Sequence, residues 1–210
     1  MFAIPPLPTS RVTVKVPATS ANLGPGLDCL AIALDMFNTV TFEKSEKFEL
    51  TVEGEGQSEL SLTKDNLIYH AFETFYQQTK DPVPRVKISC QNDIPVTRGL
   101  GSSAAAIVSG LLAANAFSTT PLSKDEILRL AASLEGHPDN VTAALVGGCV
   151  AVLYQGGAVF YCQIPIPKGL KAVTFIPDLR IGTTESRKLL EAPFPLEDVR
   201  FNMYRVALLV

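Results

Sequence analysis

Apolar and polar residues alternate along several stretches of this chain, and the period of two predicts half-buried strands. Alternating valines over residues 12–16 predict a strand that ends at Pro17. Residues 37–43 and 48–56 show the same period, and we expect them to pair with each other across a turn at residues 44–47. The N-terminal part of the chain is therefore predicted to begin with sheet.

Helical periodicity follows. Asp65 is predicted to cap a helix that ends by Pro82. One face of that helix is apolar, and its residues are Leu67, Ile68, Ala71, Phe72 and Phe75. A strand is expected next, over residues 85–89, before a glycine- and serine-rich loop and an alanine-rich helix.

Ser123 and Glu126 form a capping box, which predicts a helix over residues 124–134 with an inward apolar stripe. Pro138 suits the first turn of another helix that runs through Leu145. Residues 147–164 are then predicted to form a hairpin. Its turn is expected at residues 155–157.

The C-terminal part is predicted to hold a strand at 172–177, a short helix at 184–190 and an amphipathic helix from Glu197 onward. Residues 165–169 are the best candidate linker. We therefore expect an N-terminal domain at residues 1–168 and the start of a second domain at residues 169–210. The last helix stops without a cap or a polar tail, so we expect the chain to be a piece of a longer protein.

Composition narrows the class of protein. The 210 residues are 47% hydrophobic, which is enough for a sizeable core. Basic and acidic residues nearly balance, 18 against 21, so neither a nucleic-acid groove nor a polybasic membrane patch is indicated. Apolar runs such as residues 143–153 are too short to span a bilayer, and the N-terminus does not resemble a signal peptide. We expect a cytoplasmic protein without nucleic-acid or membrane partners.

The cysteines and histidines offer little chemistry. The four cysteines show no C-x-x-C spacing, so we expect them to be reduced, mostly buried small hydrophobes rather than disulfide or zinc ligands. They are Cys29, Cys90, Cys149 and Cys162. With only two histidines, His70 and His137, chemistry that needs several imidazoles is not expected.

Residues 95–106, P-V-T-R-G-L-G-S-S-A-A-A, form the most informative stretch. Gly99 and Gly101 can adopt positive φ and bare the backbone, so that successive amides point into one concavity. Ser102 and Ser103 follow where the alanine-rich helix starts, and its unpaired amides and dipole favour an anion such as a phosphate. A glycine turn before a serine-capped core helix explains the same residues. The spacing fits neither a Walker A loop nor a dinucleotide fingerprint.

Two further polar segments, 17–28 (P-A-T-S-A-N-L-G-P-G-L-D) and 135–140 (E-G-H-P-D-N), also end apolar elements. Together the three segments resemble the superfamily of galactokinase, homoserine kinase, mevalonate kinase and phosphomevalonate kinase, the GHMP kinases. S-A-N-L-G-P-G-L-D and H-P-D-N-V are most similar to the homoserine kinases. The resemblance covers the chain from about residue 14 to 187.

The resemblance implies an α+β, two-domain fold: an N-terminal domain like the second domain of ribosomal protein S5 and a truncated, C-terminal ferredoxin-like domain. It implies ATP as co-substrate, Mg²⁺, and transfer of the γ-phosphoryl group to the side-chain hydroxyl of L-homoserine, a step toward threonine. It leaves a homodimer open. The implied ATP-binding residues are Pro95, Val96, Thr97, Arg98, Gly99, Leu100, Gly101, Ser102, Ser103, Ala104, Ala105 and, on the adenine side, Asn66.

The same resemblance assigns the remaining site residues. Ser103 and Glu135 would hold Mg²⁺, whose preference for oxygen suits one hydroxyl and one carboxylate. The implied substrate-binding residues are Asn22, Asp28, His137, Thr183 and Arg187. Asn140 and Asp139 would orient the acceptor hydroxyl for direct in-line attack. No lysine near Pro17 matches the base partner of mevalonate kinases.

Some features depart from the homoserine kinase pattern. Only Gly136 separates Glu135 from His137, H-P-D-N-V continues with Thr142, and a C-terminal glycine-rich motif and a second substrate arginine are missing. Two alternatives stay open: a GHMP-type kinase of another small alcohol, such as a sugar or mevalonate, and a non-catalytic nucleotide-binding module. Each site residue taken alone also has a purely structural explanation. An Asn turn, an Asp cap or a solvated Glu would account for the same residue types.

Overall fold

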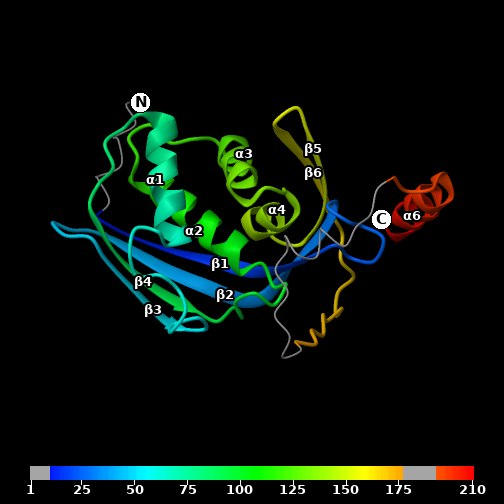
Figure 1. Cartoon of the computed structure of the whole chain (residues 1–210), viewed down its shortest axis with the longest axis horizontal. Coiled ribbons are helices and arrows are strands. Elements are labelled where there is room, and N and C mark those ends of the chain that lie inside the picture. The colour runs from blue at the N-terminus through cyan, green and yellow to red at the C-terminus, as the bar shows by residue number, and fades with distance from the viewer. Residues whose placement is uncertain (1–9, 177–192) are drawn as a thin grey trace.

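In this computed structural model, which describes residues 10–176 and 193–210, six strands form one sheet (Figure 1). In chain order the strands are β1 (Arg11–Ala21), β2 (Leu30–Lys44), β3 (Glu49–Gly54), β4 (Val86–Asn92), β5 (Cys149–Gln155) and β6 (Ala158–Ile164). β2 pairs with β1 along one edge, and β4 and β5 share its other edge. β3 and β6 lie outside β4 and β5, so the long strand β2 organises the whole sheet.

Helices of the described residues cover one face of this sheet (Figure 1). They are α1 (Leu67–Thr79), α2 (Ser102–Phe117), α3 (Lys124–Glu135) and α4 (Asp139–Val146). α2 lies at the centre, where it contacts α1, α3, α4, β1 and β2. Because it is surrounded, its small and aliphatic residues are buried on several sides of the helix rather than along one stripe.

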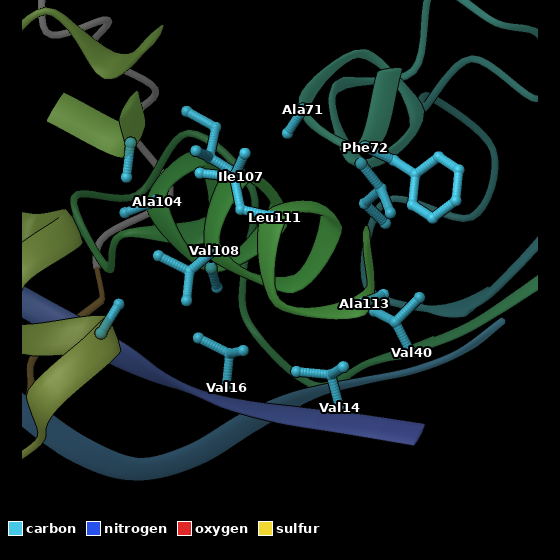
Figure 2. Close-up of a cluster of buried hydrophobic side chains, with 14 of the residues drawn as sticks. Val14, Val16, Val40, Ala71, Phe72, Ala104, Ile107, Val108, Leu111 and Ala113 are labelled. Carbon is cyan, nitrogen blue, oxygen red and sulfur yellow. The ribbon is translucent and has the colours of Figure 1, made fainter. Parts of the chain in front are cut away.

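The core lies between the helices and the sheet. Figure 2 shows Val14 and Val16 of β1 directed toward the side chains of α2, among them Val108. From α1, the ring of Phe72 stacks on Phe42 of β2, with centroids 5.2 Å apart. Every second residue of these strands thus supplies one layer of the core, as the alternation predicts.

β1 does not end at Pro17, as predicted, but runs on to Ala21. The pairing with β2 shifts register between Pro17 and Ala18. An irregularity of this kind is where a strand tolerates a residue without an N–H group. The extension carries the chain into the polar segment 17–28.

The predicted pairing of residues 37–43 with 48–56 is wrong. β4 lies between β2 and β3, antiparallel to β2 and parallel to β3. β4 buries Val86, Ile88 and Cys90 in strict alternation, and as an inner strand it pairs its backbone on both sides. The alternation of buried residues in β4 suits an inner strand, and its two ladders place it between β2 and β3.

Most helix boundaries match the prediction. The apolar face of α1 is buried through Ile68, Ala71, Phe72 and Phe75, and the capping box of α3 is present in full. The cap of α1 is Asn66, however, and not Asp65. Asn66 has the extended backbone of a cap, and its side chain accepts a hydrogen bond from the N–H of Ile68, so the helix starts one residue later.

The hairpin of β5 and β6 turns at Gly156 and Gly157, both with positive φ, as predicted. Residues 172–176 form no strand, contrary to prediction, since a strand needs a partner and they have none to pair with in the described part of the chain. Residue 177 and the predicted helix at 184–190 lie outside the described residues. The final predicted helix is present as α6 (Leu196–Leu209), without a buried residue.

The cysteines are free in the described structure, but the expectation that most are buried is wrong. Only Cys90 is buried, because it alone points from an inner strand into the core. Burial raises the pKa of its thiol to about 12. Among the helices of the described residues, none combines the length and apolar content that a bilayer crossing needs.

Candidate functional site

The loop between β4 and α2 leads directly into the first turn of α2. Gly99 and Gly101 have φ of 70° and 66°, the left-handed conformation that the sequence predicts. Gly101 is the N-cap of α2, and no side chain caps the helix. The first amides of a sixteen-residue helix therefore lack side-chain partners, which favours an anion at this end.

This loop forms one wall of a cavity of about 580 Å³. The predicted site residues that line it are Asn22, Asn66, Pro95, Val96, Thr97, Arg98, Gly99, Leu100, Gly101, Ser102, Ser103, Glu135, His137 and Asn140. Ala104 and Ala105, predicted to bind ATP, do not line it, because they are fully buried on the core side of α2. The three polar segments, which are far apart in the sequence, therefore meet around one space. Arg98 brings a cationic side chain to it.

The side chains of Ser103 and Glu135 meet at the N-terminal end of α2. The Ser103 hydroxyl donates to Oε1 of Glu135 over 2.6 Å, although α3 supplies the glutamate. The side chain of Glu135 is only 9% exposed. Burial raises the pKa of this carboxyl, the Ser103 hydrogen bond and His137 oppose that rise, and Asp139 adds to it.

A divalent cation fits this pair. A buried carboxylate whose charge is disfavoured by desolvation gains from a cation, and a hydroxyl and a carboxylate are oxygen ligands of the kind Mg²⁺ prefers. No group of three or more His, Cys, Asp or Glu side chains within residues 10–176 and 193–210 could hold a metal by itself. The pair suits an ion that takes its other ligands from phosphate and water.

His137, Asp139 and Asn140 are tied together at the start of α4. Oδ1 of Asp139 lies 2.6 Å from Nδ1 of His137 and accepts from the backbone N–H of Asn140 over 2.7 Å. The side chain of Asp139 is 1% exposed, and it does not line the cavity, whereas His137 and Asn140 do. Asp139 can thus influence the cavity only through its contacts with His137 and Asn140.

The 17–28 segment places one predicted substrate residue at the cavity. Asn22 lines it, and Oδ1 of Asn22 accepts the backbone N–H of Asp28 over 2.8 Å. Both residues have positive φ, 60° and 56°. Asp28 is half-buried behind this turn and is not among the lining residues. Thr183 and Arg187 lie outside the described residues.

Asn66, predicted to lie on the adenine side, borders the cavity at the start of α1. Its amide also caps α1 and donates to the carbonyl of Ser61 over 2.6 Å. The structural and the binding interpretations of this residue are therefore compatible.

Sequence reasoning missed Thr19, which joins the three segments. Its side chain is fully buried, its hydroxyl donates to Oδ1 of Asn140 over 2.8 Å, and its N–H donates to the carbonyl of Leu100 over 3.0 Å. It lies within the 17–28 segment already singled out, but a threonine in a strand carries no local signal of such a contact. Asn38, Cys90 and Asn92 also line the cavity and were not predicted.

The chain matches the GHMP kinases N terminal domain over residues 66–148. It is 44% identical over 200 residues to a homoserine kinase of Carboxydothermus hydrogenoformans, with 95% of this chain and 66% of that protein covered. With a homoserine kinase of Moorella thermoacetica it shares 42% identity over 197 residues, covering 94% of this chain and 67% of the relative.

Among solved structures, a Listeria monocytogenes protein assigned as a homoserine kinase superposes with a TM-score of 0.75 at 30% identity. The superposition covers 93% of this chain and 65% of that one. The chain therefore spans about two thirds of the length of the curated relatives it matches.

Proposed function

This chain belongs to the homoserine kinase family of the GHMP kinases, and from that premise we propose that it transfers the γ-phosphoryl group of ATP to the side-chain hydroxyl of L-homoserine. The α+β GHMP kinase fold expected from the sequence is confirmed by the same relatives. One observation carries the proposal: the uncapped start of α2, the Ser103–Glu135 pair and Asn140 border a single cavity.

The triphosphate is proposed to lie along residues 95–105, with Asn66 on the side of the adenine. The amides at the start of α2 would face phosphate oxygens, and Arg98 would add positive charge. Phosphoryl transfer proceeds through a loose transition state, so positioning and charge neutralisation supply most of the catalysis. A loop that presents backbone donors suits that need.

Ser103 and Glu135 would hold Mg²⁺, which when bound neutralises charge on the phosphates. Their 2.6 Å hydrogen bond already holds the hydroxyl and the carboxylate side by side. Only 9% of the Glu135 side chain is exposed, so its carboxylate faces the Ser103 hydroxyl rather than bulk solvent. The pair is therefore preorganised, and turnover should depend on a divalent cation.

The acceptor is proposed to bind next to α4 and the 17–28 turn. Asn22, Asp28, His137, Thr183 and Arg187 would bind the amino acid, with a carboxylate suited to its ammonium and a guanidinium to its carboxylate. The Asn140 amide would orient the hydroxyl, whose oxygen bonds to the γ-phosphorus as the bond to the β-phosphate oxygen breaks. The hydroxyl proton passes to the transferred phosphate or to solvent. Asp139 would act as a positioning residue through His137 and Asn140.

We further propose a boundary between an N-terminal ATP-binding unit at residues 1–168 and the start of a second unit at 169–210. Within the described residues the last hydrogen-bonded strand, β6, ends at Ile164, just before that boundary. A cytoplasmic location is proposed because ATP and free amino acids are cytosolic metabolites.

The test compares homoserine, mevalonate and galactose as acceptors at equal concentrations. Homoserine should be phosphorylated fastest, because mevalonate and galactose have no ammonium for Asp28. A faster reaction with either of the other two would favour a kinase of another small alcohol.

Glu135→Ala separates an enzyme from a non-catalytic nucleotide-binding module. Magnesium-dependent turnover should fall by at least about 100-fold, because the variant lacks the carboxylate proposed to hold the cation. Circular dichroism should show that the fold is kept. Asp125→Ala, an exposed carboxylate on the same helix, is the matched control and should leave turnover unchanged. Equal activity of both variants would exclude Glu135 from the site.

A further inference from the structure

Thr19, in the 17–28 segment, forms hydrogen bonds with both of the other functional segments. It follows the register shift of β1 at Pro17 and Ala18, and its side chain is fully buried. Its N–H holds the carbonyl of Leu100, the residue between the two loop glycines. A Cβ on Gly101 would collide with the Thr19 side chain, so backbone and side chain are in close contact here.

The hydroxyl of Thr19 fixes the direction of the Asn140 amide. It donates to Oδ1 of Asn140, and within the described residues the structure gives this hydroxyl no other acceptor. Rotation of the amide by half a turn would replace that acceptor with an NH₂ group, so the buried hydroxyl proton would lose its partner. A buried donor without a partner is strongly disfavoured.

We propose that Thr19 is a positioning residue that keeps the Nδ2 donor of Asn140 directed toward the acceptor hydroxyl in the cavity. The inference rests on the proposed function, because it concerns the group that orients the acceptor. The contacts of Thr19 connect the loop before α2 to the start of α4, which are far apart in the sequence. One residue sets both the carbonyl before Gly101, on the phosphate side, and the amide of Asn140, on the acceptor side.

Thr19→Val tests the link, because valine keeps the shape of threonine and removes only the hydroxyl. The kcat for homoserine should fall about tenfold or more, while the KM for ATP stays within about twofold, since the N–H of residue 19 is retained. Thr19→Ser, which keeps the hydroxyl, should stay within about threefold of the unsubstituted chain. Equal kcat for the valine variant and the unsubstituted chain would overturn the proposal.

A double-mutant cycle separates positioning from general packing. In an Asn140→Ala background, Thr19→Val should have no further effect on kcat, because the group it acts through is gone. Independent, multiplying losses would show that Thr19 has only a structural role. If the valine variant does not fold, Thr19→Ala against Thr19→Ser makes the same comparison.

Homoserine binding, measured by calorimetry on the same variants, keeps this inference separate from the proposed function. A lack of turnover in the unsubstituted chain would contradict the proposed kinase activity. The cycle then applies to affinity: Thr19→Val should weaken homoserine binding, and only when Asn140 is present. Affinity unaffected by Thr19→Val, or no homoserine binding at all, would overturn the inference.

Discussion

The first turn of α2 and the middle of the same helix differ sharply. Its first turn borders the cavity, has no side-chain cap, and begins at a left-handed glycine. The rest of the helix is enclosed by α1, α3, α4 and the sheet, with Ile107, Val108 and Leu111 fully buried. The buried middle of the helix supplies stability, which keeps the polar groups of the first turn in place.

Gly99 and Gly101 allow the first turn to be tested by substitution. Both have positive φ, but a Cβ would meet nothing within 4 Å at Gly99, whereas at Gly101 it would collide with Thr19. Gly101→Ala should destabilise the fold by about 3 kcal/mol, from left-handed strain and overpacking together. Its turnover should fall by more than about 100-fold.

Gly99→Ala is the matched control, with a predicted loss of about 1 kcal/mol from strain alone. Urea denaturation and initial rates measure both variants. Similar losses at the two positions would mean that the contact with Thr19 is unimportant.

Gly110 tests the buried middle of the helix. A Cβ there would collide with the Ile68 carbonyl and lie 2.9 Å from the backbone nitrogen of Phe72, both in α1. Gly110→Ala should therefore destabilise the protein by about 2 kcal/mol in chemical denaturation, despite the better helix propensity of alanine. Ala116→Gly, exposed on the same helix, should cost no more than about 1 kcal/mol. A stabilising Gly110→Ala would contradict the close approach of α1 and α2.

Thr97 tests whether strain in the loop serves binding. This β-branched residue has a φ of 57°, which threonine rarely adopts. Thr97→Gly should stabilise the fold by about 0.5–1 kcal/mol, since the relief of strain exceeds the entropy lost by glycine. The KM for ATP should rise because the loop is less rigid. A variant that is less stable than the unsubstituted chain would show that the conformation is not strained.

Glu135→Gln should give the smallest effect on stability. Burial raises the pKa of the carboxyl in the folded chain, so the folded state holds its proton to higher pH than the unfolded state does. Stability contributed in this way is present at low pH and is lost as pH rises above about 4.5 and through the raised pKa. Without magnesium, the free energy of unfolding of the glutamine variant at pH 7 should therefore be higher by about a few tenths of a kcal/mol, with a slightly higher melting temperature. The difference should vanish in acid. A lower melting temperature at pH 7 would contradict the sign.

Local patterns were sufficient wherever the determining contacts are close in sequence. The capping box of Ser123 and Glu126, the glycine turn of the hairpin and the left-handed glycines of the loop depend on neighbours a few residues away. The three segments could be joined into one site only through their resemblance to the GHMP kinases. In the structure most of the predicted residues line one cavity, whereas Asp28, Ala104, Ala105 and Asp139 do not.

The remaining features depend on contacts that no local pattern encodes. Asp65 and Asn66 are both good caps, and the choice of Asn66 depends on its second bond to Ser61. The insertion of β4 between β2 and β3 is set by pairing across more than forty residues of chain. Thr19 is an ordinary strand threonine until the fold brings Leu100 and Asn140 to it.

The shared edge of β2 has a final consequence. β4 leaves β2 at the pair Asn38 and Asn92, β5 joins it only at Ile32, and both asparagines line the cavity. The gap that opens along this edge of β2, between Ile32 and Asn38, therefore has one end at the cavity. Substitution of Asn38 or Asn92 would reshape this wall of the cavity and leave the backbone pairing of the sheet in place.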